Sequence, residues 1–123
     1  MGFCWATIQV ADLEKSIAFY RDVVGLPLNR RFAGGGGGME LAFLGDGPTQ
    51  VELICVAGRK PAGRVEGVTL GFEVASLEER MAHAASKGFP VERGPLSPNP
   101  SMRFFYVRDP DGVEVQFVEN RKA

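Results

Sequence analysis

Two repeating patterns of apolar residues divide the chain into extended and helical segments. In several short stretches apolar residues alternate with polar ones, as in Gln50–Val56 (QVELICV), which is typical of a strand with one buried face. Elsewhere apolar residues recur every three to four positions, which predicts an amphipathic helix. The helical apolar positions are Leu13, Ile17, Tyr20 and Val24 in the first half of the chain and Leu77, Met81, Ala84 and Ala85 in the second.

Both predicted helices have residues that favour helix ends. Asp12 precedes the first helix and Ser76 the second, and short polar side chains of this kind cap helix N-termini. Glu79 stands three residues after Ser76, which is the spacing of a capping box. A glycine and then a proline, typical of a helix C-terminus, follow each helix: Gly25 with Pro27, and Gly88 with Pro90.

The predicted elements occur twice in the same order. Three pairs of blocks match at an offset of 63 or 64 residues: Val10–Ile17 with Val74–Met81, Gly25–Arg30 with Gly88–Arg93, and Gln50–Val56 with Glu114–Asn120. Each copy has the order β-α-β-β-β. The expected strands are Phe3–Val10, Leu28–Phe32, Met39–Leu44 and Gln50–Val56, then Gly67–Val74, Val91–Arg93, Met102–Arg108 and Val113–Glu119.

This order predicts a single α+β domain built from two tandem β-α-β-β-β modules. We expect the modules to span about residues 1–58 and 67–123, with a linker over about residues 57–66. The glycine run Gly34–Gly38 is expected to connect two strands of a hairpin. Gly94–Ser101, which contains three prolines, is expected either to form a stiff lip over a cavity or simply to join two strands.

Composition and charge narrow the classes of protein. The chain has 123 residues, of which 45% are hydrophobic and 24% charged, as in soluble globular domains. Its net charge of −1 argues against a nucleic-acid or anionic-membrane partner. No apolar run is long enough for a membrane span and no signal peptide is evident, so a cytoplasmic location is expected. Cys4 and Cys55 are expected to be buried, reduced thiols that point to the helix side.

Alternation along the strands assigns a face to each side chain. An apolar face, which includes Val51, Leu53, Val115 and Phe117, is expected to lie under the helices. The opposite face has aromatic residues and a few polar groups, a mixture that suits a small-molecule site. An outer face with an aromatic dimer contact is the alternative. The members of this opposite face are Trp5, Thr7, Glu40, Ala42, Glu52, Ile54, Thr69, Glu73, Phe104, Tyr106, Gln116 and Val118.

The stretches VADLEKSIAFYRDVVGLPL (Val10–Leu28) and YVRDPDGVEVQFVE (Tyr106–Glu119), on two β-α-β-β-β copies, resemble the vicinal oxygen chelate superfamily. This superfamily includes glyoxalase I, extradiol dioxygenases, fosfomycin-modifying enzymes and bleomycin-resistance proteins. The resemblance implies a curved mixed sheet with the helices on its outer face and a concave cavity. It also implies a homodimer, because superfamily members of this size usually assemble their sites from two chains.

In the metal-dependent members four side chains hold a divalent ion, and the matching positions here are Trp5, Glu52, Thr69 and Gln116. Trp5 weighs most against a metal, because an indole donates a hydrogen bond and has no lone pair to offer. Thr69 is a poor ligand as a neutral hydroxyl. The only histidine, His83, is expected on the solvent side of the second helix. We therefore expect no metal and no cofactor, and we disfavour a metal-dependent lyase or dioxygenase.

Several functions stay open at this point. The first is a metal-free protein that binds a planar or cationic organic molecule, as bleomycin-resistance members do. The second is a metal-free lyase or isomerase with Glu52 as its general base. A divalent-metal enzyme with unusual ligands and an interaction module without a ligand are weaker alternatives. The candidate ligand-binding residues are Trp5, Thr7, Glu40, Glu52, Thr69, Phe104, Tyr106 and Gln116.

Overall fold

The computed structural model describes residues 1–34, 36–59, 61 and 65–121. The chain forms two compact units, Met1–Gly63 and Arg64–Ala123, which we call module 1 and module 2. The linker expected over residues 57–66 includes residues 60 and 62–64, which lie outside the described residues. Gly35 of the glycine run also lies outside them.

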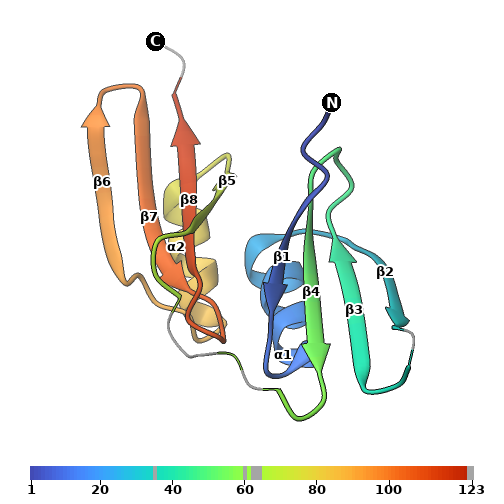
Figure 1. Ribbon diagram of the computed structural model, residues 1–123. Coiled ribbons are helices and arrows are strands. Elements are labelled where there is room, and N and C mark those ends of the chain that lie inside the picture. Colours follow the sequence, from blue (N-terminus) through green and yellow to red (C-terminus); the bar gives the residue numbers. More distant parts are fainter. Residues whose placement is uncertain (35, 60, 62–64, 122–123) are drawn as a thin grey trace. The chain divides into compact units, whose positions relative to one another are not determined.

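Module 1 is a four-stranded mixed sheet with a helical segment on one face (Figure 1). The strand order is β1-β4-β3-β2; β1 runs parallel to β4, and the other neighbours are antiparallel. The helical segment begins as an α-helix and ends as a π-helix. In chain order the elements are β1 (Trp5–Gln9), α1 (Leu13–Ala18), η1 (Phe19–Val24), β2 (Leu28–Ala33), β3 (Met39–Leu44) and β4 (Gln50–Val56).

Module 2 repeats this arrangement with the strand order β5-β8-β7-β6. Here β5 runs parallel to β8, and β8–β7 and β7–β6 are antiparallel. The prediction of an α+β fold with two β-α-β-β-β modules is confirmed, with one sheet in each module. The elements are β5 (Thr69–Glu73), α2 (Leu77–Ser86), β6 (Arg93–Asn99), β7 (Met102–Arg108) and β8 (Glu114–Asn120).

The helices begin and end at the predicted residues. The Asp12 carboxylate accepts a hydrogen bond from the Lys15 backbone N–H at 3.1 Å. The Ser76 hydroxyl accepts one from the Glu79 backbone N–H at 3.2 Å. These bonds satisfy N–H groups that have no partner within the helix. At the end of η1, Gly25 has a φ of 97°, a left-handed conformation that glycine adopts without steric cost.

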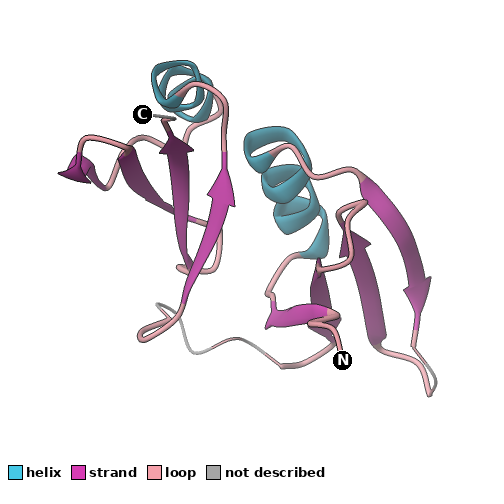
Figure 2. Cartoon of the chain, turned by 90° about the horizontal axis from the view of Figure 1, so that it is seen from above, coloured by secondary structure: helices cyan, strands magenta, loops and turns pink. Residues whose placement is uncertain are grey.

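Each helix covers one face of its own sheet, as Figure 2 shows. In module 1 the helical segment buries Leu13, Ile17, Tyr20 and Val24 as the periodicity predicted. Val51 and Leu53 of β4 are also buried, and their side chains alternate with those of the opposite face. The core of module 2 is formed by Leu77, Ala84, Phe105, Val107, Val113, Val115 and Phe117.

One strand prediction was wrong. The strand β6 spans Arg93–Asn99, whereas the sequence predicted a strand only over residues 91–93 and a connection after it. β6 is the edge of its sheet, and its register with β7 shifts between Arg93 and Leu96 and again between Leu96 and Asn99. Pro95 and Pro98 fall between these paired residues, where a backbone N–H is not needed for the ladder.

The cysteine prediction was partly wrong. Cys4 is exposed, because it lies before the first residue of β1. Cys55 is half-buried on the helix side, where its Sγ lies 3.7 Å from the Ala11 carbonyl oxygen. His83 is exposed on α2, as predicted. Among the described residues, no helix is long and apolar enough to cross a membrane.

Candidate functional site

Four side chains form a row across the sheet of module 1. Arg30 of β2 pairs with Phe43 of β3, Phe43 pairs with Glu52 of β4, and Glu52 pairs with Thr7 of β1. Directly paired residues project from the same face of a sheet, so the row lies on the face away from the helix, which we call the open face. The contacts agree with the register: the Thr7 hydroxyl donates a hydrogen bond to the Glu52 carboxylate, and the Arg30 guanidinium lies 4.4 Å from the Phe43 ring centroid.

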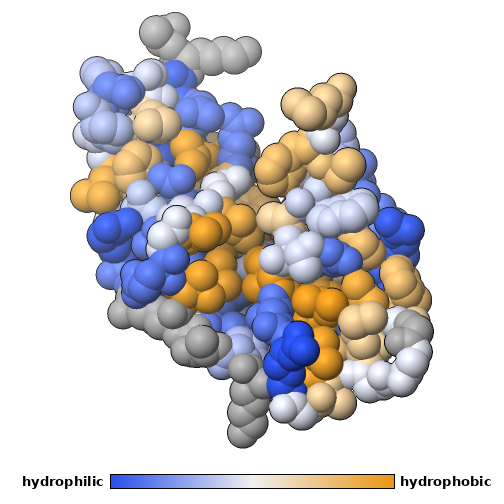
Figure 3. All heavy atoms as spheres, in the orientation of Figure 1, coloured by the Kyte–Doolittle hydropathy of each residue, from blue (hydrophilic) through white to orange (hydrophobic). Residues whose placement is uncertain are grey.

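Aromatic rings surround the centre of this row. Trp5 meets Phe43 edge to face, with 5.4 Å between ring centroids. Phe32 lies nearly parallel to Phe43 at 6.2 Å. Phe43 is only 3% exposed, whereas Trp5 is 47% and Phe32 46% exposed. The open face therefore presents two accessible rings that rest on a buried one. The surface of this module has a gathering of hydrophobic side chains (Figure 3).

Module 2 has a corresponding row. Arg93 of β6 pairs with Tyr106 of β7, Tyr106 with Gln116 of β8, and Gln116 with Gly71 of β5. The Arg93 guanidinium lies 4.0 Å from the Tyr106 ring centroid. The Gln116 amide N–H donates to the Tyr106 hydroxyl at 3.2 Å. Gly71 has no side chain, and the Gln116 Oε1 lies 3.2 Å from the position that a Cβ would take there.

The two rows differ in how their charges are balanced. In module 2, Glu114 lies beside the row, pairs with Arg93 at 3.3 Å and accepts a hydrogen bond from the Thr69 hydroxyl. In module 1, Arg30 forms no ion pair with any described residue, and Glu52 is bonded to Thr7 alone among the described side chains. Among the described residues, the open face of module 1 thus has an arginine and a glutamate that form no ion pair, whereas in module 2 Arg93 is paired with Glu114.

Most predicted site residues lie on the open faces, each within its own module. The rings of Phe104 and Tyr106 meet edge to face at 5.7 Å. Trp5, Thr7 and Glu52 share the open face of module 1, and Thr69, Phe104, Tyr106 and Gln116 share that of module 2.

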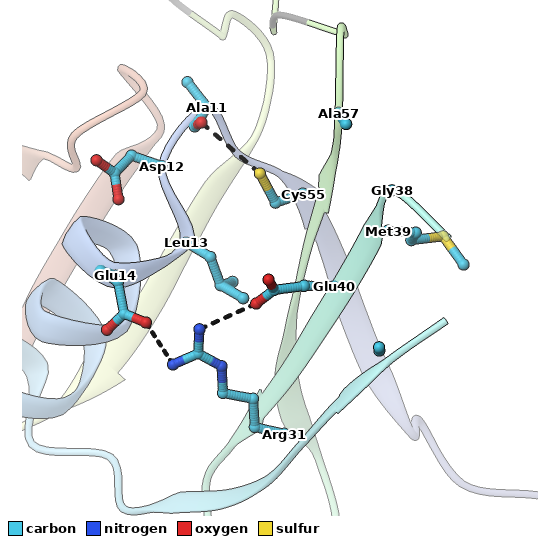
Figure 4. A pocket seen from close by; sticks show the side chains of 11 residues that line it. Ala11, Asp12, Leu13, Glu14, Arg31, Gly38, Met39, Glu40, Cys55 and Ala57 are labelled. Carbon is cyan, nitrogen blue, oxygen red and sulfur yellow. Dashed lines mark hydrogen bonds and ion pairs between the residues drawn. The ribbon is translucent and has the colours of Figure 1, made fainter. Parts of the chain in front are cut away.

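The prediction for Glu40 was wrong. Glu40 pairs with Cys55, which projects to the helix side, so Glu40 projects there too. Ala42, two residues further along β3, lies on the same side. Figure 4 shows Arg31 between two carboxylates, 3.0 Å from Glu40 and 2.5 Å from Glu14 of α1. Hydrogen bonds to Glu40 and then to Glu14 raise the pKa of Arg31 above its ordinary value. Glu40 therefore helps to hold the helix to the sheet and lies away from Glu52.

These three residues line a cavity of about 530 Å³ on the helix side of module 1 (Figure 4). Asp12 and Cys55 also line it. Asp12 is engaged in capping α1, and Arg31 neutralises much of the carboxylate charge. The cavity is thus lined by groups that already stabilise the fold.

Sequence reasoning missed Arg30, Phe43 and Arg93. Arg30 ends the block GLPLNR and Arg93 ends the matching block GFPVER. The same residue type at equivalent positions of the two copies could have indicated that both arginines share a role. Phe43 was missed because the apolar run of β3 has buried side chains on both faces, so alternation did not indicate its orientation.

The four positions at which the resemblance places metal ligands do not fit a divalent ion. The Trp5 indole has no lone pair to donate. The Thr69 hydroxyl donates its hydrogen to Glu114 and is a poor ligand as a neutral group. Gln116 donates to Tyr106 through its N–H, so its amide oxygen alone would not exclude a metal. Within the described ranges, no three His, Cys, Asp or Glu side chains are grouped so that they could hold a metal. That the protein binds no metal stays a prediction, and it rests on the chemistry of these donors.

Comparisons with known sequences agree on one protein family. A family model described as the Glyoxalase/Bleomycin resistance protein/Dioxygenase superfamily matches residues 2–117. The uncharacterized protein YwbC of Bacillus subtilis is 37% identical over 117 residues, 91% of this chain and 92% of that protein. The lactoylglutathione lyase of Haemophilus influenzae is 30% identical over 123 residues, 94% of this chain and 90% of that enzyme.

Solved structures agree on the fold. The trypanothione-dependent glyoxalase I of Leishmania major superposes with a TM-score of 0.83 at 25% identity, over 97% of this chain and 86% of that one. Glyoxalase I from Zea mays gives a TM-score of 0.85 at 24% identity. The match to the maize enzyme covers 98% of this chain but 45% of the maize chain, so it is evidence for the fold alone.

Proposed function

The chain belongs to the glyoxalase/bleomycin resistance protein/dioxygenase superfamily, and we propose that it is a metal-free protein that binds a small planar organic molecule on the open face of module 1. One observation carries the proposal. Trp5 stands at a position where the superfamily's metal-dependent members have a ligand, and it is instead an accessible ring supported by Phe43. Rings held in this way bind planar ligands by stacking at a low entropic cost.

The surrounding groups support binding rather than metal-assisted chemistry. Phe32 offers a second accessible ring, and Glu52 and Thr7 supply polar contacts on the same face. Pockets with rings and a few oriented polar groups are typical of small-molecule sites. The module 2 residues Thr69, Phe104, Tyr106 and Gln116 remain proposed ligand contacts. Glu40 is no longer among them, because it projects to the helix side.

The fluorescence of Trp5 tests this proposal directly, because Trp5 is the only tryptophan. Planar aromatic compounds should quench its emission, and Trp5→Ala should weaken their binding by about 1–3 kcal/mol as measured by calorimetry. Leu96→Ala serves as the control, since Leu96 is an exposed apolar residue of β6, in the other module. If aromatic compounds leave the emission unchanged and Trp5→Ala only lowers the melting temperature, Trp5 is a packing residue and the proposal fails.

A metal-free lyase or isomerase is the second candidate, and the Thr7–Glu52 hydrogen bond favours it. A carboxylate oriented by a hydroxyl can serve as a general base. Several relatives are named lactoylglutathione lyase, at 29–32% identity. If this candidate is right, protein treated with a chelator should still turn over its substrate. Glu52→Gln should abolish that turnover and leave the affinity for the ligand nearly unchanged. Equal turnover by the variant and the natural protein would exclude Glu52 as the base.

The proposal includes a cytoplasmic homodimer. The side chains of Phe3, Trp5 and Phe32 are apolar and exposed, and a second chain would cover this part of the module 1 surface. Two-fold dimers are also the commonest soluble oligomers. A dimer would let two chains enclose a ligand that one open face holds only from one side.

A further inference from the structure

We infer that the ligand of module 1 is amphoteric: a planar molecule with an acidic group that Arg30 binds and, at its other end, a cationic or hydrogen-bond-donating group that Glu52 binds. This inference rests on the proposed function and specifies the chemical class of the ligand. It follows from the order of side chains in the row Arg30–Phe43–Glu52–Thr7.

Arg30 is placed to bind an acid. Its guanidinium is held on the buried ring of Phe43, 4.4 Å from the centroid, while the residue as a whole is exposed. Stacking of this kind reduces the freedom of the long side chain and leaves the N–H groups at the edge of the guanidinium pointing outward. No described carboxylate pairs with Arg30. A planar carboxylate is the group that best matches these parallel donors.

Glu52 is placed to bind a donor. One of its carboxylate oxygens accepts the Thr7 hydroxyl, which fixes the orientation of the group. An ionised carboxylate has about four acceptor positions, so one hydrogen bond leaves most of them for a ligand. The residue is half-buried, and partial burial strengthens an interaction with a cation relative to one in bulk water.

The strand register limits how far apart the two charged groups lie. Arg30 and Glu52 lie on β2 and β4, separated only by β3. Neighbouring strands are about 4.8 Å apart, so the two backbones are roughly 10 Å apart. The guanidinium reaches over Phe43 and shortens that gap, yet it forms no ion pair with Glu52. Both groups therefore project from the same face, within a span that one small planar molecule lying over the sheet near Trp5 can bridge.

Module 2 provides an internal comparison. It keeps the stacked arginine and the aromatic ring of the row, but Arg93 is paired with Glu114. Gln116 stands at the position that Glu52 occupies in module 1. The same sheet architecture therefore forms without two unpaired charges. The two charged groups of module 1 are therefore not required by the fold, and they are available to a ligand that carries the opposite charges.

Three related compounds test the inference by Trp5 fluorescence and calorimetry. The amphoteric probe is 4-guanidinobenzoate, and benzoate and phenylguanidinium each keep only one of its ends. We expect 4-guanidinobenzoate to bind about 10-fold more tightly than either analogue, a typical gain for a second charge-assisted contact. Equal affinity of the three compounds, or no binding of 4-guanidinobenzoate, would overturn the inference. If uncharged quinoxaline still quenched Trp5, the proposed function would survive; if no planar compound did, both would fail.

Variants assign each end of the probe to its residue. Arg30→Gln should lower the affinity for 4-guanidinobenzoate to that for phenylguanidinium, and Glu52→Gln should lower it to that for benzoate. Arg30→Lys keeps the charge and should retain the preference for the acidic end, which separates charge from packing. Arg21→Gln is the matched control, because Arg21 is a surface arginine of η1 paired with Asp22. A preference that survives in folded Arg30→Gln would overturn the assignment.

Discussion

Arg30 lies over the ring of Phe43, with 4.4 Å between the guanidinium carbon and the ring centroid. Phe43 also contacts Trp5 and Phe32, so a single buried ring positions three exposed side chains of the open face. The geometry of the candidate site therefore depends on Phe43, although this ring itself is nearly inaccessible to a ligand.

Replacement of Phe43 by alanine should destabilise the protein by about 3–5 kcal/mol, because it removes a buried ring and leaves a cavity. Urea unfolding followed by circular dichroism measures this. Phe32→Ala is the matched control and should cost less, since Phe32 is 46% exposed. Equal losses from both variants would show that Phe43 is not the central packing residue of the face.

The purified protein should contain no stoichiometric zinc, nickel, iron or manganese. The reason is the donor set: an indole at position 5 and a hydroxyl at position 69 do not complete a coordination sphere. Elemental analysis after purification without chelators is the measurement, with a zinc protein of known metal content purified in parallel as the control. One tightly bound metal per chain would contradict the proposed function.

Stability should depend on pH through Glu119. Its carboxylate accepts hydrogen bonds from the Arg121 side chain at 2.9 Å and from the Leu77 backbone N–H at 2.8 Å, and these lower the pKa of Glu119. A carboxyl whose pKa is lower in the folded protein stabilises it above the unfolded pKa of about 4.3. That stabilisation is lost as the pH falls through the folded pKa.

Glu119→Gln should therefore be less stable than the natural protein at neutral pH, and the difference should close in acid. Urea midpoints between about pH 3 and pH 7 measure it. Asn29→Ala, at a residue of β2 that does not titrate, is the control, and its stability difference should not vary with pH in this range. A stability difference that stays constant with pH would mean that the Glu119 charge does not support α2.

Sedimentation velocity should show a dimer at micromolar concentration. The apolar side chains at Trp5 and Phe32 are costly to leave in water, and a second chain would cover them. Phe32→Glu should shift the population towards monomer by placing a charge in that surface. A stable monomer for the natural protein at this concentration would remove the dimer from the proposal.

The sequence alone determined the repeat, the order of the elements and the helix ends. These features depend on local physics: Asp12 and Ser76 cap helices through their own side chains, and Gly25 ends one through its backbone freedom. The four strand positions Trp5, Glu52, Thr69 and Gln116 were assigned through the resemblance to the superfamily, and their role in a site stays a prediction.

Only the tertiary structure decided which face each residue of β3 occupies. The segment Met39–Leu44 has buried side chains on both faces, so its alternation has no preferred phase, and Glu40 was placed on the wrong side. Pairing with β4 set the phase: Phe43 lies beside Glu52, and Glu40 lies beside Cys55. The same pairing, extended to β2, brought Arg30 over Phe43. Register between strands is a long-range property, and a one-residue shift would move every side chain to the other face.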